Sequence, residues 1–171
     1  MNTLPKGAYR NPWIWIASGL GSGLSPKAPG TFGSLAALIP YFWLRQHPVW
    51  LAIAMPIVFL IGMLAARKIR DVIPREDPGL LVLDEWVGQW LTLAPAVWLW
   101  PMLGLSAWPL WCEMLVGFVL FRTFDILKPW PVSWADRELS GGFGAMFDDA
   151  LAGVYAAASL TTVALLAQRW L

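Results

Sequence analysis

The sequence predicts an all-α integral membrane protein, a bundle of about four to five membrane helices in a single domain that covers residues 1–171. Of these residues 58% are hydrophobic, only 13% are charged and 13 are tryptophans. Soluble domains contain about 45–50% apolar and about 25% charged residues, so both values favour a membrane protein. The net charge of +1, without a basic or acidic tail, gives no indication of a nucleic-acid partner.

Five apolar segments have lengths typical of helices. A membrane-spanning helix needs about 20 residues, whereas about 10 to 14 suit a buried or re-entrant segment. The first segment has 11 residues, which leaves room for one re-entrant hairpin, and internal prolines predict kinks that neighbouring helices must satisfy. The segments are Ser34 to Leu44, Val49 to Ala66, Trp86 to Trp100, Ala107 to Phe121 and Ala150 to Ala167.

The charged residues orient these segments. If the first four segments form two out-and-back hairpins, three polar segments share one face of the membrane. These polar segments are residues 1–33, 67–85 and 122–149. They hold ten of the twelve Lys and Arg residues, the exceptions being Arg45 and Arg169, so the shared face should be cytoplasmic. Ten of the eleven acids lie there too, Glu113 being the exception, and we therefore expect any active-site loops on this face.

Two pairs of adjacent acids lie at predicted entrances to membrane helices. Asp84 and Glu85 precede one apolar segment, and Gly88 lies one turn further on the same helix face, where it would let another backbone or a ligand approach closely. Asp148 and Asp149 follow a glycine-rich stretch that we interpret as a loop before the last helix. Either pair is also explained as acids that stabilise a helix N-terminus. Because adjacent carboxylates repel each other unless a cation shares them, we favour a divalent cation, and oxygen ligands suit Mg²⁺.

The motif "FRTFDILKPWP" places Arg122, Asp125 and Lys128 three residues apart. On a helix that ends at the proline, neighbouring members of this set share a face. A local series of ion pairs at the depth of the lipid headgroups is the alternative explanation, and it is the stronger one for Lys128 taken by itself.

The stretch "GSGLSPKAPGTFGS" at positions 21–34 interrupts the apolar chain with glycines, hydroxyl groups and a single lysine. Ser25, Lys27 and Thr31, with a helix N-terminus directly after them, could bind a phosphate, although a simple turn is the alternative. His47 lies in a predicted outer turn, and Cys112 lacks the arginine that a cysteine-dependent phosphatase needs six positions later. A metal-activated water is therefore the remaining nucleophile for a hydrolase.

Three blocks taken together, "GSGLSPKAPGTFGS", "LDEWVGQW" and "FRTFDILKPWPVSWADRELSGGFGAMFDDALAG", resemble the phosphatidylglycerophosphatase A family. The resemblance extends over residues 13–165. It implies a Mg²⁺-dependent phosphomonoesterase of the bacterial cytoplasmic (inner) membrane, multi-pass, with a helical bundle in which one helix packs among several others. The implied reaction removes the terminal phosphate of phosphatidylglycerophosphate to give phosphatidylglycerol and inorganic phosphate.

The resemblance also implies roles for individual residues. The catalytic set would be Asp84, Glu85, Asp125, Asp148, Asp149 and Lys27. Within this set we assign four acids to the metal and Asp125 to a fifth ligand position or to an orienting base. The four metal ligands would be Asp84, Glu85, Asp148 and Asp149. The residues that bind the substrate phosphate would be Ser25, Lys27, Thr31, Arg122 and Lys128. Asp136 and Arg137 are expected to be solvated, the alternative being contact with the glycerol headgroup.

The expected partners are the phospholipid substrate and the bilayer, with no nucleic acid and no obligate protein partner. Two other functions stay open at this point. One is a phosphatase of the same fold for another lipid or isoprenoid phosphate, because apolar grooves that would set specificity cannot be identified from sequence. The other is a small cation-coupled transporter, which should carry charges near the middle of the bilayer, where Glu113 is the one candidate.

Overall fold

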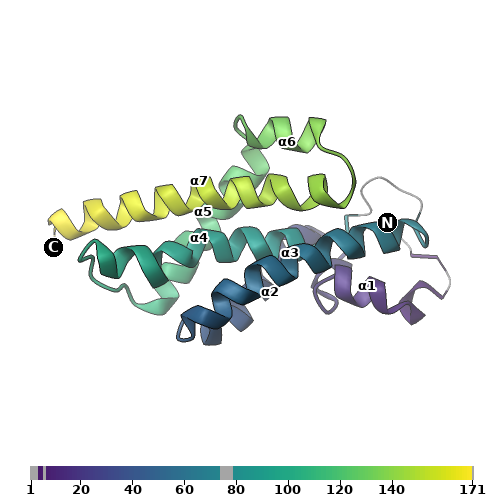
Figure 1. Cartoon of the computed structure of the whole chain (residues 1–171), viewed down its shortest axis with the longest axis horizontal. Coiled ribbons are helices and arrows are strands. Elements are labelled where there is room, and N and C mark those ends of the chain that lie inside the picture. Colours follow the sequence, from purple (N-terminus) through teal and green to yellow (C-terminus); the bar gives the residue numbers. More distant parts are fainter. Residues whose placement is uncertain (1–3, 6, 74–78, 171) are drawn as a thin grey trace.

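The computed structural model describes residues 4–5, 7–73 and 79–170, and within them every regular element is helical, as predicted (Figure 1). Two short 3₁₀ turns accompany seven α-helices. The elements are η1 (Ala8–Arg10), α1 (Pro12–Ala17), η2 (Ser22–Leu24), α2 (Pro29–Leu44), α3 (Pro48–Arg70), α4 (Leu83–Met102), α5 (Leu110–Leu127), α6 (Val132–Glu138) and α7 (Gly141–Trp170). Four of the charges counted above, Lys6, Arg75, Glu76 and Asp77, lie outside the described residues.

Helix α4 is the central element of the bundle, and it packs against α7, α2, α3 and α5. Its large side chains are tied to these neighbours by hydrogen bonds as well as by apolar contacts. The indole Nε1 of Trp90 donates to the carbonyl of Ala37 on α2 at 2.8 Å, and that of Trp100 donates to Thr161 Oγ1 on α7 at 3.3 Å. These bonds satisfy polar groups that would otherwise be buried without partners.

The contact between α4 and α7 depends on two glycines. A Cβ on Gly153 of α7 would lie 2.5 Å from the carbonyl oxygen of Gly88 on α4, and a Cβ on Gly88 would lie 2.7 Å from the carbonyl oxygen of Asp149. Thr92 Oγ1 donates to the Gly88 carbonyl at 2.8 Å. The prediction that another backbone approaches Gly88 is therefore confirmed, and the approach brings the first turn of α4 beside Asp149.

The outward faces of α2, α3, α5 and α7 are apolar, although no other part of the chain that the structure describes covers them. Exposed side chains on these faces include Ile39, Ile57, Leu115 and Val154. Within the described residues, α3 and α7 are the two helices long and apolar enough to cross a membrane. The bundle thus has two candidate membrane-length helices, and a total of four to five spans stays a prediction.

Glu113 is the acid outside the three polar segments, and its ion-pair partner, Arg45, also lies outside them. Its side chain is fully buried and accepts hydrogen bonds from Arg45 at 2.9 and 3.1 Å and from the Tyr41 hydroxyl at 2.6 Å. This ion pair joins the end of α2 to the start of α5. This ion pair explains why an acid is buried at position 113, and no role in ion transport is needed to explain it.

Two helices begin earlier than the sequence predicted. Helix α2 starts at Pro29 instead of Ser34, and α7 starts at Gly141, so its first turns replace the predicted glycine-rich loop. Gly142 of α7 serves packing, because a Cβ at this position would collide with the carbonyl oxygen of Met63 on α3. Asp148 and Asp149 consequently lie inside a helix and do not cap its N-terminus.

Candidate active site

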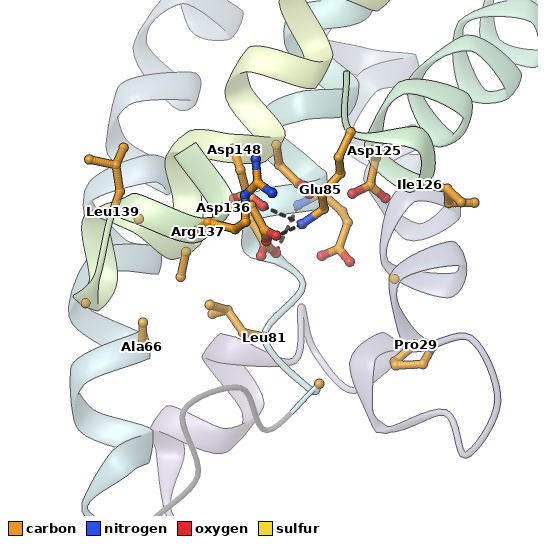
Figure 2. A pocket seen from close by; sticks show the side chains of 18 of the residues that line it. Pro29, Ala66, Leu81, Glu85, Asp125, Ile126, Asp136, Arg137, Leu139 and Asp148 are labelled. Atoms are coloured by element: carbon orange, nitrogen blue, oxygen red, sulfur yellow. Dashed lines mark hydrogen bonds and ion pairs between the residues drawn. The ribbon is translucent and has the colours of Figure 1, made fainter. Parts of the chain in front are cut away.

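A cavity of about 760 Å³ opens where the start of α2, the end of α3, the start of α4, the end of α5, α6 and the start of α7 meet. Its volume is in the range of small-molecule sites. Six carboxylates and four basic side chains line it. They are Asp84, Glu85, Asp125, Asp136, Asp148 and Asp149, and Arg70, Arg122, Lys128 and Arg137. Figure 2 shows the carboxylates of Glu85, Asp125, Asp136 and Asp148 gathered in the centre, with Pro29, Ala66 and Leu81 further out.

Three of these acids are arranged as a cation site. One carboxylate oxygen from each of Asp84, Glu85 and Asp149 lies within 4.8 Å of the others. Oε2 of Glu85 is buried and has no hydrogen-bond partner among the described residues, although a buried carboxylate oxygen normally has one. The donors are all carboxylate oxygens, which suits a hard divalent cation. The cluster could therefore hold a metal ion that satisfies the unpaired oxygen.

Both acids of α4 lie in its first turn, before the apolar segment of that helix, and their ionisation is disfavoured in the absence of a cation. Burial raises the pKa of Asp84 well above its usual value, and the charges of Glu85 and Asp148 add to this. Burial also raises the pKa of Glu85 to about 8; a hydrogen bond with Asp84 opposes the rise, and the charges of Asp149 and Asp125 add to it. A bound cation would reverse this effect, because an opposite charge nearby favours the ionised form.

Arg122 lies beside this cluster and connects three helices. Its NH1 is 2.5 Å from Asp125 Oδ2, 4.0 Å from Glu85 Oε1 and 3.4 Å from the Ser34 hydroxyl oxygen. Arg122 and Asp125 share a face of α5, as their spacing predicted. The structure places Asp125 against the guanidinium and outside the three-acid cluster.

The N-terminus of α2 also points to this part of the cavity. Ala28, its N-cap, has a φ of 47° and gives no side-chain cap, so the first N–H groups of the helix lack an acceptor within it. A Cβ on Gly30 would collide with Glu85 Oε1 and would lie 3.1 Å from Arg122 NH1. At position 30 the backbone of the stretch 21–34 therefore approaches the acidic cluster closely.

The side chains predicted to bind phosphate from this stretch lie nearby but do not line the cavity. Ala28, Pro29 and Gly30 line it, whereas Ser25, Lys27 and Thr31 do not. The Ser25 hydroxyl donates to the Lys27 carbonyl at 2.8 Å, and Lys27 itself is exposed.

Lys128 joins three elements at the cavity wall. It is the C-cap of α5, with a φ of 43°, and its Nζ binds Asp136 on α6 and, at 2.9 Å, Asp148 Oδ2 on α7. Burial lowers the pKa of Lys128, but its hydrogen bonds to Asp136 and Asp148 outweigh burial and raise it above the usual value, so the lysine stays protonated. One oxygen of Asp148 is thereby committed to Lys128, and Asp136, which was expected to be solvated, is a partner in this ion pair.

Sequence reasoning overlooked Arg70 altogether. It is the last residue of α3 and follows Arg67 and Lys68, and nothing in the sequence distinguishes it from these two exposed neighbours. Only the packing of α3 shows that Arg70 lines the cavity while Arg67 and Lys68 do not.

Comparison with known proteins agrees with the resemblance seen in the sequence. The family model for phosphatidylglycerophosphatase A matches residues 15–164. A phosphatidylglycerophosphatase A from Escherichia coli is 40% identical over 88% of this chain and 82% of its own length, and one from Haemophilus influenzae is 38% identical over 91% and 90%. A relative from Bacteroides thetaiotaomicron, 36% identical over 83% and 87%, is named as a candidate phosphatidylinositol-3-phosphatase. No solved structure matches the chain.

Proposed function

Because the chain belongs to the phosphatidylglycerophosphatase A family, we propose that it hydrolyses the terminal phosphate of phosphatidylglycerophosphate to give phosphatidylglycerol and inorganic phosphate. This makes it a phosphatidylglycerophosphatase, a phosphoric monoester hydrolase. The observation that carries the proposal is the convergence of three carboxylates, a guanidinium and a helix N-terminus on one cavity. A metal-assisted phosphatase requires carboxylates that hold a cation and, beside them, hydrogen-bond donors for the phosphate oxygens.

Asp84, Glu85 and Asp149 would hold Mg²⁺. Asp148 would be a further ligand through the oxygen that Lys128 does not bind. When bound, the ion supplies positive charge that polarises the phosphoryl group and lowers the pKa of water. The unpaired oxygen of Glu85 supports this assignment, because a cation would give it the partner that the described residues do not.

The phosphoryl group would lie between Arg122 and the first turn of α2. Arg122 donates to phosphate oxygens and offsets the charge that develops in the transition state, and Asp125 holds its guanidinium in place. The backbone of Gly30, which can approach this point because it lacks a side chain, adds N–H donors at the positive end of a helix. Lys128 would neutralise charge at the opposite wall. Ser25 and Lys27 would contribute from the segment before α2, and Thr31 from the first turn of that helix.

Hydrolysis then requires water to attack the phosphorus in line with the leaving glycerol oxygen. A carboxylate of the cluster would accept a proton from that water, and the leaving oxygen would take up a proton from solvent as the bond to phosphorus breaks. The acyl chains of the substrate stay in the bilayer throughout. The apolar outer faces of α2, α3, α5 and α7 support this placement, because they suit contact with lipid. We propose a multi-pass arrangement with the cavity on the cytoplasmic side.

Phosphate release by the purified protein tests the proposal. We expect release from phosphatidylglycerophosphate that stops in excess chelator and returns with Mg²⁺. Asp84→Asn and Asp149→Asn should each lower kcat by at least about 100-fold, since even residues that merely support metal ligands cost 10- to 100-fold. Asp71→Asn is the matched control, because Asp71 is exposed and lies outside the cavity. Full activity in chelator, or in both site variants, would contradict the metal assignment.

A second substrate class is favoured by one comparison. The relative from Bacteroides thetaiotaomicron bears the name of a phosphatase for a different phospholipid, so the same framework could serve another lipid phosphate. Parallel assays with phosphatidylinositol 3-phosphate and an isoprenoid phosphate distinguish these functions. A higher kcat/KM on either of them than on phosphatidylglycerophosphate would replace the proposed substrate. The structure does not favour a cation-coupled transporter, because Glu113, the one candidate for a charge near the middle of the bilayer, is paired with Arg45.

A further inference from the structure

The four basic side chains of the cavity form two groups with different surroundings. The inner group, Arg122 and Lys128, is partly buried, and carboxylates of the site hold both members. The outer group, Arg70 and Arg137, is exposed, and neither residue has an ion-pair partner in the part of the chain that the structure describes. The outer group is therefore available to a ligand that enters the cavity.

Each outer arginine is anchored to the cavity by its own helix. Arg70 ends α3 directly after Ile69, which is buried and lines the same cavity with Ala66. Arg137 lies on α6, and its Nε donates to the carbonyl of Ser133 at 3.0 Å. This bond orients the guanidinium and leaves its two terminal nitrogens without an acceptor in the described residues.

The charge of the lining indicates why these residues matter. With every acid ionised, six carboxylates exceed four basic groups by two charges, and one divalent cation brings the formal charge of the lining to zero. Without Arg70 and Arg137 the lining would stay negative even with the cation bound. The substrate of the proposed reaction carries a phosphomonoester at its end and a phosphodiester inside its headgroup, and a negative lining would repel both.

Building on the proposed function, we propose that Arg70 and Arg137 form a second anion subsite, which binds the internal phosphodiester of the lipid one glycerol unit away from the scissile phosphate. Arginine suits this role because its planar guanidinium can donate two parallel hydrogen bonds to a phosphate. The subsite makes the cavity selective for headgroups with two phosphates. The product keeps the phosphodiester, so phosphatidylglycerol should compete with the substrate at this subsite.

The test compares Arg70→Gln and Arg137→Gln with Arg67→Gln, a control on the exposed side of α3 that lies outside the cavity. Phosphate release from phosphatidylglycerophosphate in mixed micelles gives kcat and KM. Inhibition by phosphatidylglycerol probes the second subsite, and inhibition by inorganic phosphate probes the site of the scissile phosphate. Each site variant should raise KM and weaken inhibition by phosphatidylglycerol about threefold to tenfold, as expected for charged hydrogen bonds at a partly exposed position.

Unchanged kcat and unchanged inhibition by inorganic phosphate would show that the variants are folded and that the effect belongs to the second subsite. The proposal is overturned if both variants match Arg67→Gln in KM and in inhibition by phosphatidylglycerol. It is also overturned if inhibition by inorganic phosphate weakens equally, since the arginines would then serve the scissile phosphate. A wild-type protein that releases no phosphate would instead refute the proposed function, and this inference with it.

Discussion

Substitution of Gly30 by alanine is expected to affect activity much more than folding. Position 30 is in the first turn of α2, where alanine should stabilise the helix by about 0.5–1 kcal/mol because it loses less backbone entropy than glycine. The new methyl group would collide with Glu85 Oε1 and would lie 3.1 Å from Arg122 NH1. The nearest atoms to the methyl group all belong to these two side chains, so both side chains must move.

The side chains that move belong to the active site, so the movement should affect catalysis. Introducing a methyl group into a packed position costs about 1–3 kcal/mol. The gain in helix stability offsets part of this cost. The free energy of unfolding should therefore fall by about 2 kcal/mol or less. A displacement of about 1 Å in a catalytic group can lower the rate about 100-fold. For Gly30→Ala we expect kcat/KM to fall about 100-fold while the melting temperature in detergent falls by about 8 °C or less.

Gly117→Ala on α5 is the matched control. A Cβ at Gly117 would collide with the Leu93 side chain in the apolar core and would touch no residue of the cavity. This variant should lower the melting temperature and keep kcat/KM per folded molecule. If folded Gly30→Ala retains kcat/KM within about threefold of the wild type, Glu85 and Arg122 do not need the positions seen here, and our assignment of the α2 N-terminus is refuted.

Three further predictions concern the rest of the chain. Lys27→Ala should lower kcat/KM about tenfold with little loss of stability, since a charged hydrogen bond to phosphate is lost; unchanged kinetics would remove Lys27 from the site. Arg45→Ala should lower the free energy of unfolding by about 3 kcal/mol, because it leaves the Glu113 carboxylate buried without its cation, and a stability equal to that of the wild type would show that the pair is not needed. Single cysteines that replace Ser25 or Ser140 should react with a membrane-impermeant reagent from the cytoplasmic side alone, and labelling from the other side would overturn the orientation.

Composition and the lengths of apolar segments were sufficient to predict an all-helical bundle, because both depend on hydrophobicity alone. The starts of α2 and α7 were predicted too late for a common reason. Glycines before Ser34 and Ala150 were interpreted as loop residues, yet Gly30 and Gly142 lie inside helices, where the missing side chain makes room for Glu85 and for the backbone of α3. A glycine that serves close packing cannot be distinguished from a loop glycine without the neighbouring helix.

The acids of the site could be predicted because adjacent carboxylates at the edge of a membrane segment are costly without a cation. The ion-pair partners of these acids on other helices could not be predicted. Lys128 binds Asp136 and Asp148, which are eight and twenty positions later in the chain, and this pairing follows from the position of α6 beside α7. Arg70 depends on the packing of α3 in the same way. Local spacing predicts partners within one helix, such as Arg122 and Asp125, and says little about partners on different helices.

The geometry of the acidic cluster depends on a contact that contains no charge. Asp84 and Asp149 lie on different helices, and the distance between them is set where Gly88 meets Gly153. Gly88 is four residues from Asp84 and Gly153 is four residues from Asp149, so each of these acids lies one helical turn from the contact. A larger residue at either glycine would separate the helices within one turn of the two acids. Small residues at this contact are thus a condition for the arrangement of the three acids that we propose to hold the metal, as well as for close packing of the bundle.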